Sequence, residues 1–149
     1  MMERSYQHDG GSFLEIYQNC NIFNDGAFEE YTGKEKLDNV IELENGKPML
    51  FARETKGIKL EGSKAIVVSM DDHSAEDLLV HDETDLDMAH IIANWTSNPQ
   101  LPEPIGVIYC VDRPTYNQDM VDQINSAKEK KGKGSVQGLL NAGDTWVVD

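Results

Sequence analysis

Short apolar runs along the chain predict buried strands, each bounded by turn residues. Residues 13–17, 40–43 and 105–111 form such runs, and each is too short for a helix of typical length. The pair Gly10-Gly11 lies just before the first run and suits the turn between the end of a helix and a strand. We therefore expect a helix, a glycine turn and a strand at the start of the chain, a step typical of parallel sheets.

Two turns with a central glycine predict antiparallel hairpins in the middle of the chain. Asn45-Gly46 separates two apolar runs, the second of which ends at Phe51, and Glu61-Gly62 separates residues 57–60 from residues 65–70. Asn and Gly accept the positive φ angles that tight hairpin turns require. The middle of the chain is therefore predicted to be antiparallel β structure.

One helix is predicted over residues 84–96, where apolar residues recur with a helical period. Thr84 or Asp82 suits the N-cap, and Asn98-Pro99 suits the end of the helix. The face expected to pack inward has the spacing i, i+3, i+4, i+7 and consists of Met88, Ile91, Ile92 and Trp95.

A second main helix is predicted over residues 116–130. Thr115 and Gln118 have the spacing of a capping box at its start. Its apolar residues, expected to face inward, are Met120, Val121, Ile124 and Ala127. A short helix over residues 135–141 and an extended piece at residues 146–148 are expected to follow. The predicted fold class is α/β with a mixed sheet, two hairpins and two main helices.

Composition and charge narrow the functional classes. A length of 149 residues suits one domain, and the net charge of −14 opposes binding to nucleic-acid phosphates. The apolar runs are far shorter than the roughly 20 residues that a membrane helix needs. The first residues lack the apolar segment of a signal peptide. We therefore expect a cytoplasmic protein that binds neither nucleic acid nor membrane.

The histidines offer little support for a metal site. His73, His81 and His90 lie in or beside an acidic stretch, but no HxH, HExxH or paired CxxC spacing occurs. This stretch is expected to form a solvated acidic face. Sequence motifs for a serine hydrolase, a nucleotide-binding loop or a dinucleotide-binding turn are also missing, so the sequence predicts no catalytic residue.

The two cysteines occupy different sequence contexts. Cys110 lies within an apolar run and is expected to be a small core residue. Cys20 follows the predicted strand at residues 13–17 and is flanked by Asn19 and Asn21. Loops at the carboxyl ends of parallel strands are where α/β proteins bind ligands. The residues alone leave open whether Cys20 is an idle loop thiol or a ligand.

Four sequence blocks, in this order, carry a resemblance to a known family. The blocks are FLEIYQNCNIFNDGAF, LLVHDET, PIGVIYCVDRPTY and LLNAGDTW. Together they resemble the carboxyl-terminal portion of the beta subunit of 2-oxoacid:ferredoxin oxidoreductases, closest to the 2-oxoglutarate type. The resemblance implies that residues 1–30 are the end of a thiamine diphosphate-binding α/β domain, including its last strand. Residues 31–149 would then form an α+β carboxyl-terminal domain.

The resemblance also implies an activity, cofactors and partners. Enzymes of this family oxidatively decarboxylate a 2-oxoacid, transfer the acyl group to coenzyme A and reduce ferredoxin. The complete beta subunit holds thiamine diphosphate, Mg²⁺ and a 4Fe-4S cluster, and it works beside an alpha or alpha-gamma partner. Cys20 matches the last of the four cluster thiolates, so the resemblance implies that it is a cofactor-binding metal ligand.

The chain also departs from the family pattern. The upstream CxxC pair, a further single cysteine and the GDG motif followed by asparagine have no counterpart in it. We therefore expect an amino-terminally truncated subunit that binds no cofactor and has no activity alone. Two alternatives from other classes remain: a free-standing acidic domain that binds a basic protein, and a small metal-binding protein that uses Cys20 and histidines.

Overall fold

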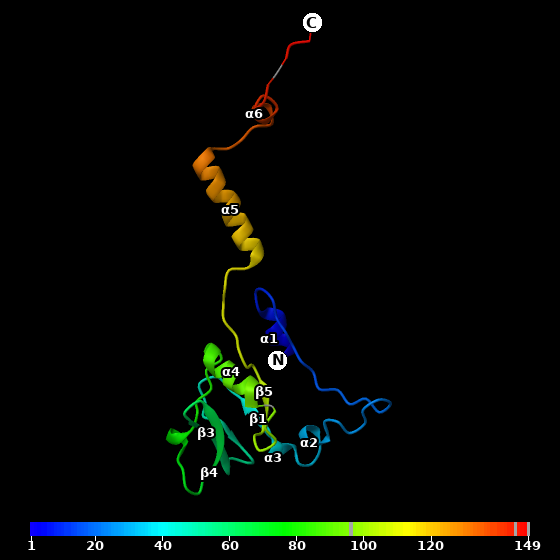
Figure 1. Cartoon of the computed structure of the whole chain (residues 1–149), viewed down its shortest axis with the longest axis vertical. Helices are drawn as coiled ribbons and strands as arrows, with labels where there is room; N and C mark the ends of the chain where they lie inside the picture. The colour runs from blue at the N-terminus through cyan, green and yellow to red at the C-terminus, as the bar shows by residue number, and fades with distance from the viewer. Residues whose placement is uncertain (96, 145, 149) are drawn as a thin grey trace. The chain divides into compact units, whose positions relative to one another are not determined.

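The computed structural model describes residues 1–95, 97–144 and 146–148, which fall into two units (Figure 1). The first unit contains Met1–Gln7 and Ser12–Val111, and the second contains His8–Gly11 and Asp112–Asp149. The helices of the first unit are α1 (Met2–Gln7), α2 (Glu29–Thr32), α3 (Lys36–Asn39), the 3-10 helix η1 (Ala75–Asp77) and α4 (Leu86–Trp95). Its strands are β1 (Val40–Leu43), β2 (Leu50–Phe51), β3 (Lys56–Glu61), β4 (Lys64–Ser69) and β5 (Glu103–Gly106).

A three-stranded antiparallel sheet has the strand order β2-β3-β4. The pairing of Glu61 with Lys64 closes the β3–β4 hairpin, and Gly62 in its turn has a φ of +63°. This confirms the hairpin predicted at Glu61-Gly62. Strand β2 reaches β3 through Ala52, Arg53 and Glu54, which have φ angles of 52°, 56° and 65°. Positive φ is sterically costly for residues with a side chain, so this turn is strained.

The hairpin predicted at Asn45-Gly46 is wrong, although the turn itself is present. Gly46 has a φ of +76°, and the Lys47 amide donates to the Glu44 carbonyl at 3.1 Å. Strand β1, however, pairs in parallel with β5, whereas β2 belongs to the other sheet. The turn therefore joins two sheets, and β1 pairs with a strand from much later in the chain.

Helix α4 packs one face into the core of the first unit, as its apolar spacing predicts. Ile92 is fully buried and Trp95 is almost so, while Met88 and Ile91 are partly buried against the same core. The buried core consists of Ile41, Leu43, Met49, Phe51, Ala52, Ile58, Ile92 and Trp95. Both sheets contribute to it, which makes the strands and α4 one compact body.

The strand predicted at residues 13–17 is wrong. This segment is neither helix nor strand, and Figure 1 shows it running between α1 and α2 outside the sheets. Phe13 is 92% exposed and Ile16 is 60% exposed. A strand requires a hydrogen-bonded neighbour, and among the described residues no strand pairs with this segment.

A strand is present near the predicted residues 105–111, but it is shorter than predicted and begins earlier in the chain. Strand β5 starts at Glu103 and ends at Gly106, whose φ is +144°. Cys110 therefore lies beyond the strand and is only half-buried, so its prediction as a core residue is wrong. The backbone leaves the ladder at a conformation that only glycine adopts readily, and the apolar run continues outside the sheet.

The second unit contains α5 (Tyr116–Lys131) and α6 (Val136–Leu140). The Thr115 hydroxyl accepts from the Gln118 amide at 3.2 Å, which confirms Thr115 as the N-cap, while the reciprocal bond of a capping box stays a prediction. The inward face predicted for α5 is wrong, because Met120, Val121 and Ile124 are 38%, 53% and 48% exposed. A helical period shows which face could be buried, but burial needs a packing partner, and this unit buries no residue of α5.

The coarse prediction of an α/β fold is confirmed, since the first unit has one parallel and one antiparallel sheet together with helices. The assignment of residues 1–30 to a thiamine diphosphate-binding domain stays a prediction. Residues 146–148 are neither helix nor strand. In the part of the chain that the structure describes, no helix has the length and apolar character to span a membrane.

Candidate functional site

Cys20 lies in the loop between α1 and α2, and its side chain is exposed. The Asn24 amide donates to the Cys20 carbonyl at 2.9 Å, and the two residues form an isolated antiparallel bridge. The chain therefore reverses direction immediately after the cysteine. The expectation that this thiol lies in a loop of turn residues is correct.

The backbone that follows Cys20 favours its charged form. The amides of Phe23, Ile22 and Asn24 hold the pKa of the Cys20 thiol below its usual range, the amide of Phe23 contributing most. Hydrogen bonds to the charged form favour that form, so the turn stabilises a thiolate. A thiolate is the form of cysteine that binds metals and acts as a nucleophile.

Asn19 closes the loop that carries the cysteine. Its side-chain oxygen accepts from the Gly26 amide at 2.9 Å, and its side-chain nitrogen donates to the Asp25 carboxylate at 2.9 Å. Gly26 has a φ of +76°, which a residue with a side chain adopts only at a cost. One asparagine side chain thus joins the two ends of the segment 19–26.

Aromatic side chains join the two ends of this loop, and one of them, Tyr17, also contacts the sheet. The rings of Tyr17 and Phe28 stack with centroids 4.8 Å apart and planes 3° from parallel. The ring of Tyr31, in α2, lies 6.3 Å from Tyr17 at a tilt of 40°. The Tyr17 hydroxyl donates to the carboxylate of Glu103, the first residue of β5. The loop is therefore fixed at Tyr17, before the cysteine, and at Phe28, after it.

The surroundings of Glu103 are poor in water. Glu103 itself is 8% exposed. Burial, followed by the hydrogen bond to Glu103, raises the pKa of Tyr17 well above its usual range. Burial and the nearby charge of Glu103 raise the pKa of Tyr31 as well. Both phenols are therefore held in the neutral form, in which Tyr17 can donate to the carboxylate.

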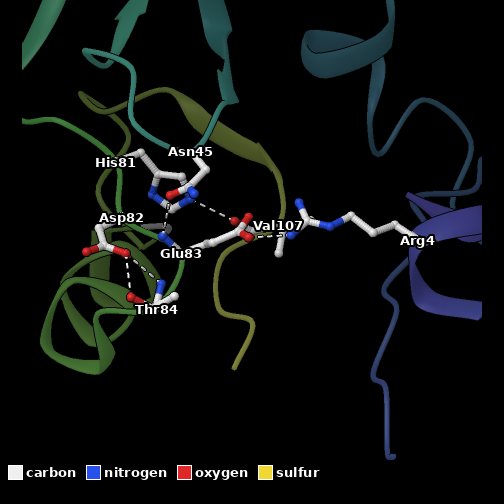
Figure 2. A network of polar contacts seen from close by, with 7 residues as sticks. All are labelled: Arg4, Asn45, His81, Asp82, Glu83, Thr84 and Val107. Atoms are coloured by element: carbon white, nitrogen blue, oxygen red, sulfur yellow. Dashed lines mark hydrogen bonds and ion pairs between the residues drawn. The ribbon is translucent and has the colours of Figure 1, made fainter. Parts of the chain in front are cut away.

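A second group of polar contacts lies around Glu83 (Figure 2). Arg4 of α1 donates to the Glu83 carboxylate, and the Glu83 amide donates to the side-chain oxygen of Asn45 at 3.1 Å. The Cys110 amide donates to the Glu83 carbonyl at 2.7 Å. The carboxylate of Glu83 raises the pKa of Arg4. This residue therefore connects α1, the turn after β1 and the segment after β5.

His81 is part of the same group and is 1% exposed. Its Nε2 lies 2.8 Å from the Val107 carbonyl (Figure 2), whereas its Nδ1 has no partner among the described residues. The prediction of a solvated face is therefore wrong for His81 and for Glu83, which is 9% exposed. It is correct for Asp71, Asp72, Asp82 and His90, which are exposed. Charge density along a sequence does not reveal which polar side chains turn inward to satisfy backbone groups.

Sequence reasoning missed Tyr17, Phe28 and Glu103 as parts of the Cys20 environment. One signal was available for Glu103, because it lies between Pro102 and Pro104 in an otherwise apolar run. A carboxylate in such a run has to find a partner when the strand is buried. The identity of that partner, a tyrosine 86 positions away, follows only from the tertiary structure.

No group of three or more His, Cys, Asp or Glu side chains among the described residues is arranged to hold a metal ion.

Comparisons with known proteins extend the sequence resemblance. No protein-family model matches the chain, and no solved structure matches it. The chain is 30% identical, over 159 aligned residues, to the protein 2-oxoglutarate oxidoreductase subunit KorB of Mycobacterium tuberculosis. The alignment covers 100% of this chain and 41% of that relative, a share consistent with the expected carboxyl-terminal portion. The whole chain is therefore similar to part of a 2-oxoglutarate oxidoreductase subunit, which confirms the resemblance carried by the four sequence blocks.

Proposed function

We propose that this chain is the carboxyl-terminal part of the beta subunit of a 2-oxoacid:ferredoxin oxidoreductase, most similar to the 2-oxoglutarate type. The similarity to a 2-oxoglutarate oxidoreductase subunit over the full length of the chain supports this assignment. In the complete enzyme the reaction is oxidative decarboxylation of a 2-oxoacid to an acyl-coenzyme A with reduction of ferredoxin. The proposed location is the cytoplasm.

The proposed role of Cys20 is to supply one thiolate to a 4Fe-4S cluster. The observation that carries this proposal is the exposed position of Cys20 at the start of a tight turn, which the Asn24 amide closes by donating to the Cys20 carbonyl at 2.9 Å. Iron–sulfur clusters are held by cysteine thiolates, and hydrogen bonds to those sulfurs adjust the reduction potential. When bound, the cluster would carry electrons from the 2-oxoacid to ferredoxin.

The other cofactors of the proposed enzyme would not be held by this chain. Thiamine diphosphate, Mg²⁺ and the remaining three cluster thiolates require motifs that this sequence does not contain. The proposed partners are an upstream segment of the beta subunit and an alpha or alpha-gamma subunit. The chain alone is accordingly expected to be inactive and to form no stable cluster.

Reconstitution with iron and sulfide in the absence of air tests this proposal. The 149-residue chain alone should stay colourless, because four thiolates are normally required. A subunit that also contains the upstream segment should develop the broad absorption near about 400 nm that arises from sulfur-to-iron charge transfer.

Two cysteine variants of that longer subunit decide the assignment. Cys20→Ser should weaken or abolish the cluster, whereas Cys110→Ser should retain it, because Cys110 lies half-buried beyond β5 in the group around Glu83. Loss of the cluster in Cys110→Ser together with its retention in Cys20→Ser would show that the ligand assignment is wrong.

A further inference from the structure

The Cys20 loop contains its own hydrogen bonds, but its position relative to the sheet depends on two side-chain contacts. Tyr17 precedes the loop and Phe28 follows it, and their stacked rings bring its two ends together. The Tyr17 hydroxyl then connects this aromatic pair to Glu103 of β5. A phenol that both stacks and donates can fix the position and the direction of the backbone that leaves it.

Glu103 is a fixed acceptor. It pairs with Val40 at the start of the parallel β1–β5 ladder, and the next pair joins Ile41 and Pro104. Ile41 is fully buried in the core of the first unit. The carboxylate therefore extends from backbone that is held in place by the core. Its hydrogen bond to Tyr17 restricts the position of the tyrosine ring.

The turn that carries Cys20 is closed by the Asn24 amide, which donates to the Cys20 carbonyl at 2.9 Å. Such a turn keeps its shape only while the loop stays closed and its ends stay together. Residues 18–27 bury little apolar surface that could perform this task, and Ile22 and Phe23 are 79% and 89% exposed. The contacts at Tyr17 and Phe28 are thus the ones that connect the loop to buried structure.

We propose that Tyr17 and Glu103 are positioning residues for the Cys20 sulfur. Their hydrogen bond, together with the Tyr17–Phe28 stack, holds the loop closed, with the Asn24 amide bonded to the Cys20 carbonyl, before any metal binds. The consequence of this arrangement for a cluster rests on the proposed function, but the effect on the loop does not.

A buried glutamate contributes little to the stability of a fold, because its carboxylate loses hydration. Its presence at position 103 therefore favours a specific role. Taking a carboxylate out of water costs free energy, and an apolar side chain of similar volume often stabilises a buried position as well or better. An apolar residue, however, could not accept a hydrogen bond from Tyr17. Glutamine could accept it, which provides a conservative variant for a test.

NMR of the 149-residue chain labelled with ¹⁵N tests the effect on the loop. The readouts are the chemical shifts of the Ile22, Phe23 and Asn24 amides and the exchange of the Asn24 amide with water on the timescale of seconds. Tyr17→Phe keeps the stack and removes the donor, and Glu103→Ala removes the acceptor. Each should accelerate exchange of the Asn24 amide by roughly three- to tenfold, the equivalent of one lost hydrogen bond. Glu103→Gln should restore slow exchange.

The matched control is Glu83→Gln, which alters a different buried carboxylate of the same unit and should leave the loop amides unchanged. The amides of Ile41 and Ile92 report whether the core of each variant is intact. Unchanged loop amides in Tyr17→Phe and Glu103→Ala, with the core signals preserved, would overturn the proposal. The conservative variants Tyr17→Phe and Glu103→Gln keep the test valid if Glu103→Ala does not fold.

The electron paramagnetic resonance spectrum of the reduced cluster, in a subunit that includes the upstream segment, separates this inference from the proposed function. The positioning role is supported if the spectrum of Tyr17→Phe differs from that of the wild type while the spectrum of Glu103→Gln matches the wild type. If Cys20→Ser retains the cluster while Tyr17→Phe still loosens the loop, the ligand assignment fails and the positioning role stands. If Cys20→Ser loses the cluster while Tyr17→Phe changes neither loop nor spectrum, the positioning role fails alone.

Discussion

Gly106 and Leu43 are paired at the end of the parallel β1–β5 ladder, and a Cβ on Gly106 would lie 2.7 Å from the Leu43 carbonyl oxygen. Gly106 also has a φ of +144°. The close contact that a Cβ would make and the positive φ therefore both disfavour any residue other than glycine at position 106. The backbone leaves β5 at this residue and runs on to Val107, whose carbonyl meets His81.

Gly106→Ala should destabilise the first unit by about 2–4 kcal/mol, because neither the strain nor the contact with backbone can be relieved by a rotamer change. Urea denaturation measures the loss. The control Gly134→Ala places a Cβ where no atom lies within 4 Å, and it should change stability by less than about 0.5 kcal/mol. Equal stability of the two variants would contradict the close approach of β5 to β1.

Ile92→Ala should cost about 2–5 kcal/mol, since the side chain is fully buried between α4 and the sheets and its removal leaves a cavity. Leu86→Ala, in the same helix but 50% exposed, should cost much less. Thermal unfolding of the two variants compares these effects. A larger loss for Leu86→Ala would show that α4 packs through a different face.

Glu54→Gly should stabilise the protein by up to about 1 kcal/mol, because glycine adopts the φ of 65° at this position without steric cost. The same substitution at Glu42, an exposed residue within β1, should destabilise by roughly 0.5–1 kcal/mol, since a glycine in a strand loses more backbone entropy on folding. Chemical denaturation of both variants shows whether each substitution raises or lowers the free energy of unfolding. Destabilisation by Glu54→Gly would contradict the strained turn between β2 and β3.

Asp82 should make the stability depend on pH in the acidic range. The Thr84 hydroxyl and then the Thr84 amide, which donate to Asp82 at 2.7 and 2.8 Å, hold the pKa of this carboxyl below its usual value. The folded protein therefore favours the carboxylate, and this contribution is present above about pH 4 and lost as the pH falls through the folded pKa. The stability difference between wild type and Asp82→Asn, from urea midpoints, should accordingly shrink between pH 7 and pH 3.

The variant Thr84→Val provides the control for Asp82, because it removes the hydroxyl donor and keeps the amide donor. It should reduce the pH-dependent difference without abolishing it. A difference between wild type and Asp82→Asn that grows as the pH falls would have the wrong sign and would refute the assignment.

Joint neutralisation of Asp71, Asp72 and Glu76 to the corresponding amides should change stability by no more than about 0.5 kcal/mol per site, because all three side chains are exposed. Thermal unfolding in the presence and absence of a divalent cation gives both stability and metal binding. A large loss of cation affinity in the triple variant would reveal a metal site in this stretch.

Local patterns in the sequence determined the elements whose formation depends on neighbouring residues. The period of Met88, Ile91, Ile92 and Trp95 was sufficient to predict α4, and the pair Thr115 and Gln118 was sufficient to predict the start of α5. The hairpin at Gly62 and the loop around Cys20 belong to the same class. In each, the deciding interactions join residues a few positions apart, so the pattern of residue types contains the information.

Only the tertiary structure decided which elements pair and which polar groups are buried. The sequence does not show that β1 pairs with β5, that the His81 ring contacts the Val107 carbonyl or that the Tyr17 hydroxyl donates to the Glu103 carboxylate. It also does not show that the apolar face of α5 stays exposed within its unit, or that no strand among the described residues pairs with residues 13–17. The physical reason is that pairing and burial depend on contacts between distant segments, and a segment with the right pattern forms them only where a complementary surface is present.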